Sequence, residues 1–132
     1  MKLKIGDKFS TTKQITDAVI RAFAELSGDF NPIHLDEEFA AKTLFKRRIA
    51  HGMISGALIS AVLGNEFKEK KIIYLSQTMN FIAPVFVDDI VTATATVTEI
   101  RTDKQIVTIE TICSNQTGAT VVTGEGKIML LS

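Results

Sequence analysis

Residues 51–67 read HGMISGALISAVLGNEF, and they decide the fold class. Nearly every position after Gly52 is apolar, so the pattern predicts a helix that begins near Gly52 and has almost no polar face. A helix that is apolar all round is normally buried on all sides. This one also carries small residues, which let other backbone segments approach closely: Gly56, Ala57, Ser60 and Ala61.

The residues that follow this helix are predicted to form antiparallel strands. Residues 89–101, DIVTATATVTEIR, alternate apolar residues with threonine, which is the clearest strand pattern in the chain. Further strands are predicted over residues 71–82, 105–114 and 119–131, with turns at 102–104 and 115–118 and a break near Pro84. Four long strands and one buried helix predict an α+β fold, in which a curved antiparallel sheet wraps the helix.

The N-terminal part is predicted to contain one strand and two helices. Residues 1–10 are predicted to form a strand with a turn at Gly6-Asp7. A helix that begins at Thr16 or Asp17 is predicted to end at Gly28, and Asp36 is predicted to be the N-cap of a second, short helix. No linker or repeat divides the chain, so residues 1–132 are expected to form one domain.

Composition excludes several classes of partner. The 15 basic and 15 acidic residues give a formal net charge of +0, which argues against a broad nucleic-acid surface. The N-terminus has no apolar leader, and no uninterrupted apolar run reaches the roughly 18 residues of a membrane helix. The single Cys113 indicates a buried free thiol in a reducing compartment. We therefore expect a cytoplasmic protein that binds neither nucleic acid nor a membrane.

The irregular segment between the first two predicted helices carries a candidate acid–base pair. Asp29 and His34 are five residues apart, and a carboxylate with an imidazole can divide general base and acid work on one water. Between them, Pro32 keeps Asn31 out of the α region, and Asn31 can orient Asp29 or satisfy local backbone groups. A simple turn fits the same residues, and spacing alone favours that turn. Two histidines and one cysteine offer no metal-ligand set.

The start of the predicted buried helix is a candidate oxyanion hole. The first N–H groups of a helix have no acceptor inside it, and Gly52 has no side chain to shield its own. Ser60 follows eight residues later, which is close to two turns, so its hydroxyl is predicted near the same face. The alternative for Ser60 is a hydrogen bond to a carbonyl of its own helix.

Three segments together resemble a known family. FAELSGDFNPIH, residues 23–34, followed by Ala40, resembles the hydratase 2 signature of MaoC-like (R)-specific enoyl-CoA hydratases. AHGMISGALISAVLG, residues 50–64, and IYLSQTMNFIAPVFVDD, residues 73–89, resemble the same family in the same order. The likeness is greatest to the short, single-domain hydratases that supply polyhydroxyalkanoate synthesis.

The resemblance implies a hot-dog fold and a homodimer, with higher oligomers left open. It implies that Asp29 and His34 are the catalytic pair and that the N–H of Gly52 holds the thioester oxygen. It also suggests that Ser60 lies near the active site. Leu63 is a candidate lining residue for the acyl chain, and Asn31 a candidate neighbour of the substrate.

One position departs from the family pattern. The family often has Arg-Pro where this chain has Arg47-Arg48. The cluster of Lys46, Arg47 and Arg48 could reach the phosphates of a CoA tail, or it could be a solvated charged loop.

The activity implied is the reversible (R)-specific hydration of a trans-2-enoyl-CoA to an (R)-3-hydroxyacyl-CoA. No cofactor is implied, because CoA is part of the substrate. Three other functions stay open: an acyl-CoA thioesterase on the same scaffold, a dehydratase acting on carrier-protein thioesters, and a non-catalytic acyl-CoA-binding module. Acyl chain length is not predicted by the sequence.

Overall fold

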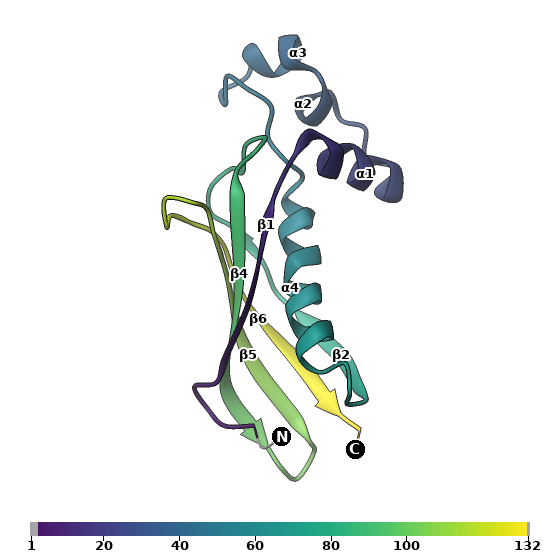
Figure 1. Ribbon diagram of the computed structural model, residues 1–132, viewed down its shortest axis with the longest axis vertical. Helices are drawn as coiled ribbons and strands as arrows, with labels where there is room; N and C mark the ends of the chain where they lie inside the picture. Colours follow the sequence, from purple (N-terminus) through teal and green to yellow (C-terminus); the bar gives the residue numbers. More distant parts are fainter. Residues whose placement is uncertain (1–2, 132) are drawn as a thin grey trace.

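One six-stranded antiparallel sheet with a long helix packed on it makes up most of the structure, a computed structural model that describes residues 3–131 (Figure 1). The strands follow the order β1-β4-β5-β6-β2, and β3 pairs with β6. The strands are β1 (Lys8–Gln14), β2 (Ile72–Gln77), β3 (Asn80–Phe81), β4 (Ile90–Arg101), β5 (Ile106–Ser114) and β6 (Thr120–Leu130). The helices are α1 (Asp17–Ser27), α2 (Pro32–Leu35), α3 (Glu37–Ala41) and α4 (Gly52–Glu66).

The core lies between α4 and the inner face of the sheet. Helix α4 packs mainly on β4 and β1, and its side chains Ile54, Leu58, Ile59, Val62 and Leu63 are buried there. Every second residue of β4 faces them, because side chains of a strand alternate between its two faces: Val91, Ala93, Ala95 and Val97 are all buried. This curved antiparallel sheet around a helix confirms the predicted α+β, hot-dog architecture.

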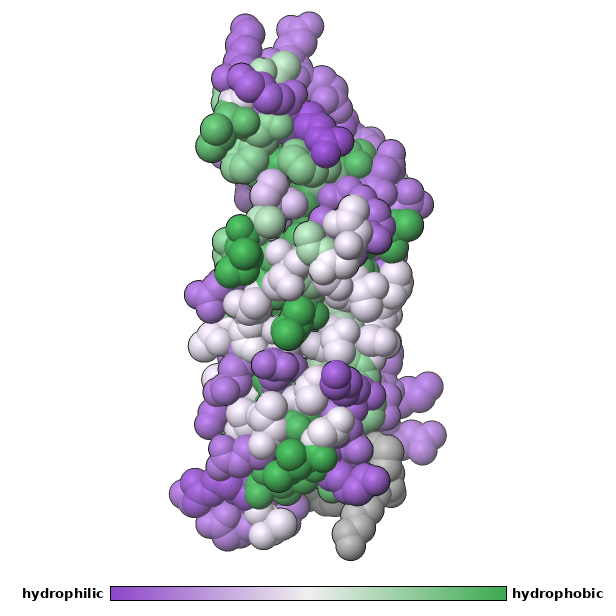
Figure 2. Space-filling view, turned by 90° about the vertical axis from the view of Figure 1, so that its left-hand side faces the viewer, coloured by the Kyte–Doolittle hydropathy of each residue, from purple (hydrophilic) through white to green (hydrophobic). Residues whose placement is uncertain are grey.

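The outer face of the sheet is mixed in character, as the alternation predicts. The intervening residues of β4 are threonines, of which Thr92, Thr94 and Thr96 are partly exposed. Figure 2 shows this side of the molecule: pale and purple residues predominate across its middle, with only isolated green ones. The predicted strands at 89–101, 105–114 and 119–131 are confirmed to within about a residue or two at each end.

Two other predicted strands differ from the observed ones. The first strand is Lys8–Gln14 rather than residues 1–10, because the turn at Gly6 precedes it and residues 8–14 pair with β4; residues 1–2 lie outside the described residues. The predicted strand 71–82 is divided into β2 and β3. Gly124 of β6 runs directly against the backbone oxygen of Thr78 at this division, an approach that only glycine permits.

The helices also differ from the prediction at two places. The segment 29–34, expected to be irregular throughout, contains the short helix α2, which begins at Pro32 because proline suits the first helical position. Helix α4 is not buried on all sides in this chain. Met53 is 51% exposed, and Ala57 and Ser60 are also exposed, because the sheet covers only one side of the helix.

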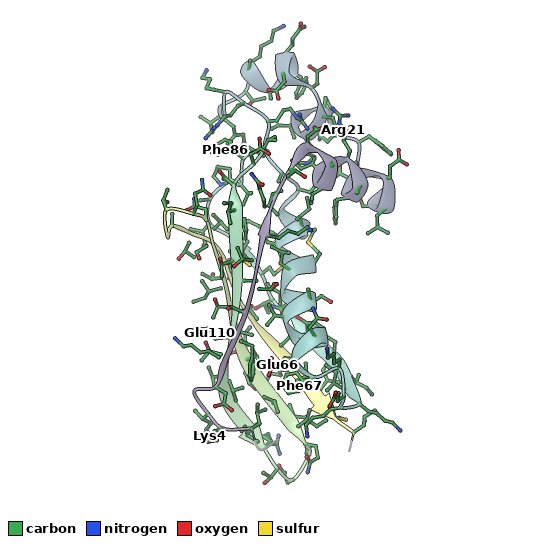
Figure 3. All side chains as sticks on the ribbon, viewed as in Figure 1. Lys4, Arg21, Glu66, Phe67, Phe86 and Glu110 are labelled. Carbon is green, nitrogen blue, oxygen red and sulfur yellow. The ribbon has the colours of Figure 1, made fainter. Side chains whose placement is uncertain are left out.

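Helices α1, α2 and α3 gather at one end of the sheet, beyond the N-terminus of α4 (Figure 1). Figure 3 places Arg21 and Phe86 at this end, and Glu66 and Phe67 near the opposite end of α4. Phe67 closes the core there, with its ring edge-on to Phe9 at a centroid distance of 5.9 Å. Among residues 3–131, no helix has the length and apolar character to cross a bilayer.

Candidate active site

A left-handed glycine ends α1 and directs the chain into the site. Gly28 has φ +80°, and its N–H donates to the carbonyl of Ala24 at 2.8 Å, so the predicted helix end is confirmed. The hydroxyl of Ser27 then accepts the N–H of Asp29 at 3.1 Å. Oδ1 of Asp29 in turn accepts the N–H of Asn31 at 3.1 Å. The carboxylate is therefore held by local backbone, while half of its side chain stays exposed (50%).

Helix α2 carries His34 toward that carboxylate. Pro32 begins the helix, and the Asn31 side chain caps it by accepting a backbone N–H at 3.0 Å. Nδ1 of His34 lies 2.8 Å from the carbonyl oxygen of Ile49. Because a carbonyl only accepts, Nδ1 carries the hydrogen and Nε2 of the neutral ring is a free acceptor. Nε2 lies 4.0 Å from Oδ2 of Asp29.

The surroundings of His34 favour its neutral form. Its side chain is only 12% exposed. Burial lowers the pKa of His34 below its ordinary value of 6.5; the neighbouring His51 and Arg48 lower it further, while the bond to Ile49 and the Asp29 charge raise it. The imidazole is thus neutral at neutral pH, and its Nε2 can accept a hydrogen bond from a water molecule.

His51 connects the two residues of the pair. Its ring stacks on the ring of His34 at a centroid distance of 3.8 Å. Its Nε2 donates to the backbone carbonyl of Asp29 at 3.0 Å, and its Nδ1 is buried without a hydrogen-bond partner in the structure. The sequence analysis named His51 only as the neighbour of Gly52. Nothing in the local sequence shows that its ring reaches Asp29, since that contact joins segments 22 residues apart.

Asp29, His34 and His51 also form a set of metal-ligating types. Their candidate ligand atoms all lie within 4.8 Å of one another, which the argument from residue counts missed. Two of the four ring nitrogens already donate to backbone carbonyls, and a third is the buried Nδ1 of His51. Because that Nδ1 is buried, the carboxylate and Nε2 of His34 are left as accessible ligand atoms, fewer than the three protein ligands of a catalytic zinc site.

A cavity of about 520 Å³ opens beside His34 and the start of α4. Its polar lining includes His34, Gly52 and Ser55, and the rest is mainly apolar, with Met53 and Phe81 among the lining residues. Gly52 is the first residue of α4, so its N–H has no acceptor within the helix. A Cβ built on Gly52 would lie 2.7 Å from Cε1 of Phe81, so a glycine is needed for this aromatic ring to cover the helix end.

Several predicted site residues do not line this cavity in the single chain. Asp29 is one of them, although its carboxylate lies 4.0 Å from Nε2 of His34, which does line it. Asn31 is exposed and acts as the α2 cap. Ser60 is exposed and does not line the cavity. Leu63 is 1% exposed and belongs to the core between α4 and the sheet. Ser55, which the sequence analysis did not single out, lines the cavity instead of Ser60.

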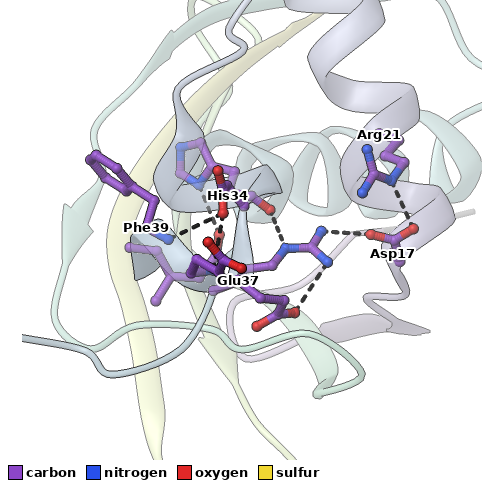
Figure 4. Close-up of polar contacts among 9 residues, drawn as sticks. Asp17, Arg21, His34, Glu37 and Phe39 are labelled. Carbon is purple, nitrogen blue, oxygen red and sulfur yellow. Dashed lines mark hydrogen bonds and ion pairs between the residues drawn. The ribbon is translucent and has the colours of Figure 1, made fainter. Parts of the chain in front are cut away.

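The predicted basic cluster separates into exposed and buried members. Lys46 and Arg47 are exposed, and the guanidinium of Arg47 lies 3.6 Å above the ring of Phe86. Arg48 is buried and bonded to the carbonyl of His34 and to the carboxylate of Asp17 (Figure 4). The structure therefore corrects the prediction for Arg48, because this guanidinium is not available to a phosphate of CoA.

Comparisons with known proteins show which family and which relatives the chain resembles. A family profile described as "MaoC like domain" matches residues 2–119. The chain is 48% identical over 128 residues to an (R)-specific enoyl-CoA hydratase of Aeromonas caviae, covering 97% of this chain and 96% of that protein. It is 44% identical to an (R)-specific enoyl-CoA hydratase of Rhodospirillum rubrum, covering 97% and 88%. The solved structure of an A. caviae (R)-hydratase involved in PHA biosynthesis superposes with a TM-score of 0.92, at 48% identity and 97% coverage of both chains.

Proposed function

The chain belongs to the MaoC-like domain family, and we propose that Asp29 and His34 are the residues with which it carries out the hydro-lyase reaction of its relatives. That reaction is the (R)-specific, reversible hydration of a trans-2-enoyl-CoA to an (R)-3-hydroxyacyl-CoA. The single observation that carries the assignment of residues is the free Nε2 of His34, which faces the Asp29 carboxylate at 4.0 Å beside the cavity.

The separation of the two groups suits one shared water. A distance of 4.0 Å is too long for a direct hydrogen bond. If one water oxygen lies about 2.8 Å from each of the two groups, the angle between its two hydrogen bonds is about 90°. Such a water donates one hydrogen to the carboxylate and one to Nε2 of His34. Its oxygen lone pairs then point away from both groups and toward the substrate.

The proposed step balances as an addition of water. Asp29 accepts one proton while the water oxygen bonds to C3 of the enoyl group. The electrons of the double bond move toward the thioester carbonyl, giving an enolate-like oxygen. The pair of Asp29 and His34 returns one proton to C2, so H and OH have been added across the double bond. No resident cofactor is needed, since CoA is part of the substrate.

Gly52 is the proposed donor to the thioester oxygen. Its N–H stands at the positive end of the α4 dipole and beside the cavity that holds His34. A hydrogen bond that strengthens as negative charge develops on the oxygen lowers the barrier. The largely apolar lining of the cavity suits an acyl chain, and Lys46 and Arg47, both exposed, are the proposed contacts for CoA phosphates.

We further propose that the chain acts as a homodimer. Large apolar side chains are exposed on β2, at the end of β3 and just beyond it, at one edge of the sheet: Ile73, Tyr74, Leu75, Phe81 and Ile82. A second copy paired at that edge would cover them and the exposed face of α4. Ser60, exposed in one chain, would then lie at an interface. Sedimentation equilibrium at micromolar concentration tests this, and a monomer would contradict it.

The activity is tested by following the loss of the conjugated enoyl thioester over a series of acyl chain lengths. Product is trapped with an (R)-specific or an (S)-specific 3-hydroxyacyl-CoA dehydrogenase, and a thiol reagent reports free CoA. We expect turnover in the (R)-coupled assay without thiol release. Thiol release would identify a thioesterase, an (S) product would contradict the assignment, and no turnover on any enoyl-CoA would favour a binding module. Faster turnover of the matched carrier-protein thioester would identify the carrier-protein dehydratase.

A further inference from the structure

We propose that Arg48 is a positioning residue, whose buried guanidinium fork joins α1, α2 and α3 and fixes the direction of the His34 imidazole. The inference rests on the proposed catalytic role of His34. It assigns to Arg48 a part in the reaction that needs no contact with the substrate.

The contacts of the guanidinium carry the inference. Nε of Arg48 donates to the backbone carbonyl of His34 at 2.6 Å. Nη2 donates to Oδ1 of Asp17 at 2.6 Å, and Nη1 lies 3.4 Å from Oε1 of Glu37 (Figure 4). The arginine side chain is only 7% exposed, whereas the two carboxylate side chains are 47% and 69% exposed. A planar fork with fixed donor directions bonds these three acceptors at once, which an ammonium group cannot do.

The residue after Arg48 completes a clamp on His34. The carbonyl of Ile49 accepts the Nδ1 hydrogen of His34 at 2.8 Å, and the N–H of Ile49 donates to the carbonyl of Ile33 at 3.3 Å. Residues 48–49 thus hold residues 33–34 by three bonds. Two of these bonds fix the backbone of α2, and the third fixes the ring rotation and the tautomer. Because the tautomer leaves Nε2 unprotonated, the clamp determines which atom faces Asp29.

Helix α2 needs such a clamp because it is very short. It spans the four residues Pro32–Leu35, and a single helical turn is not stable by itself in water. Its own ends are held by the Asn31 cap and by a bond from the N–H of Asp36 to the carbonyl of Pro32. Neither of these bonds involves the imidazole or the carbonyl of His34. The orientation of the ring therefore depends on residues 48–49, together with the ring of His51 that stacks on it.

The charges around the guanidinium agree with a firm contact. The hydrogen bond from Arg48 is the largest cause that lowers the pKa of Asp17, followed by the one from Arg21. A buried arginine that loses such a partner is left as an uncompensated charge, which is costly. The ion pair with Asp17 of α1 therefore fixes the guanidinium, and the guanidinium in turn binds α2 through the carbonyl of His34.

Two variants of Arg48 separate geometry from charge. Arg48→Met removes the fork and its charge, and Arg48→Lys keeps the charge but cannot reach the His34 carbonyl and Asp17 together. Asp17→Asn weakens the ion pair that holds Arg48, and it changes a half-exposed side chain. This variant replaces Arg48→Met in the experiment if Arg48→Met does not fold. Arg21→Met is the matched control, because it removes the other, exposed arginine on the same Asp17 carboxylate, 2.8 Å away, without touching α2.

The kinetic measurement compares kcat and KM at a temperature where each variant is folded by circular dichroism. We expect kcat to fall about 10- to 100-fold in both Arg48 variants, with KM changed by less than about threefold. Asp17→Asn should show a smaller fall of the same kind, and Arg21→Met should keep wild-type kcat. Wild-type kcat in Arg48→Met, or full recovery of kcat in Arg48→Lys, would overturn the proposal.

A spectroscopic measurement tests the same clamp without any assay of turnover. The chain has two histidines, so ring 15N shifts can be assigned with a His51→Gln variant. We expect a single Nδ1–H tautomer for His34 in the wild-type protein and an averaged signal in the Arg48 variants. A single, unchanged tautomer in those variants would overturn the proposal even if kcat fell. If the wild-type protein hydrates no enoyl-CoA, the proposed function fails, while the 15N result still decides the clamp.

Discussion

Nε2 of His34 and Oδ2 of Asp29 lie 4.0 Å apart, with Asp29 in the turn between α1 and α2 and His34 within α2. The carboxylate is fixed from one side by the backbone of its own turn, and the imidazole from the other by the carbonyl of Ile49. Because each group has its own support, either side chain can be changed without removing the support of the other. This independence makes the proposed roles separable by substitution.

Asp29→Asn is expected to remove hydration while the fold remains. An asparagine oxygen can still accept the N–H of Asn31, so the turn keeps its bond, but an amide cannot take a proton from water. We expect kcat/KM to fall by roughly 10²–10⁴-fold with the melting temperature unchanged to within a few degrees. Steady-state hydration and thermal unfolding are the measurements. Turnover close to wild type in this variant would rule out Asp29 as the base.

The pH dependence should reveal the lowered pKa of His34. Burial is the largest cause, so the ring stays neutral to a lower pH than an ordinary histidine. The proposed active form has His34 neutral, and protonation of the ring on acidification removes this form. The acid limb of kcat/KM is therefore expected below pH 6.5, the ordinary value. A midpoint above that value would contradict the assignment.

The same pKa shift has a consequence for stability. Since the folded state binds the His34 proton less readily than the unfolded chain, stability contributed by the neutral ring is lost as the pH falls through the unfolded pKa toward the folded one. His34→Gln should reduce this acid-side loss. The midpoint of urea unfolding, measured between pH 5 and pH 8 for both proteins, provides the comparison.

Much of the fold could be predicted because local patterns decide it. The alternation in residues 89–101 gave β4 nearly to the residue, and Gly28, Thr16 and Asp36 marked helix ends that the structure confirms. Each of these signals acts through its own backbone or its immediate neighbours. Local patterns did not predict which apolar residues stay exposed in the single chain. The pattern of α4 indicates burial on all sides, but the sheet covers only one of them.

Local sequence signals predicted how the segments of the candidate site are held, and they missed the contacts that depend on packing. His34 and Gly52 line one cavity, and Asp29 lies 4.0 Å from Nε2 of His34. Spacing alone favoured a simple turn at Asp29 and His34, and the family resemblance implied the catalytic roles that we propose for them. Ser60 does not line that cavity. Eight residues of helix place it about 12 Å further along α4 than Gly52, away from the cavity at the start of the helix. In the sequence, Arg48 cannot be told apart from Lys46 and Arg47, because all three are consecutive basic residues. Only the folded chain shows that it is buried against α2.

Removal of metal ions is expected to leave turnover unchanged. Although Asp29, His34 and His51 lie together, one nitrogen of each ring is already a donor to a backbone carbonyl. Dialysis against EDTA, followed by hydration assays with and without added zinc, tests this expectation. Activity that EDTA abolishes and zinc restores would show that the three residues act as ligands and would replace the shared-water mechanism.

Cys113 is expected to be unreactive in the folded protein. Its side chain is 0% exposed, and burial raises its pKa to about 11, so almost no thiolate exists at pH 8. Ellman's reagent should therefore react with less than one thiol per chain until guanidinium is added, and with one thereafter. Rapid reaction of the native protein would contradict this. The result also matters for the thiol assay that tests for thioesterase activity. If Cys113 does not react with the reagent, any thiol that this assay detects comes from released CoA and not from the protein.

Gly52→Ala is expected to lower activity without lowering stability. The added Cβ would lie 2.7 Å from Cε1 and 2.8 Å from Cδ1 of Phe81, so the ring must move into the cavity or away from the helix end. Either shift displaces the thioester from the Gly52 N–H, and we expect kcat/KM to fall by about tenfold or more.

Gly64→Ala on the same helix is the matched control, because its Cβ would meet nothing within 4 Å. The control should gain about 0.5–1 kcal/mol of unfolding free energy and keep wild-type kcat/KM. Equal loss of activity in both variants would show that helix α4 as a whole, rather than the approach of Phe81 to Gly52, limits the reaction.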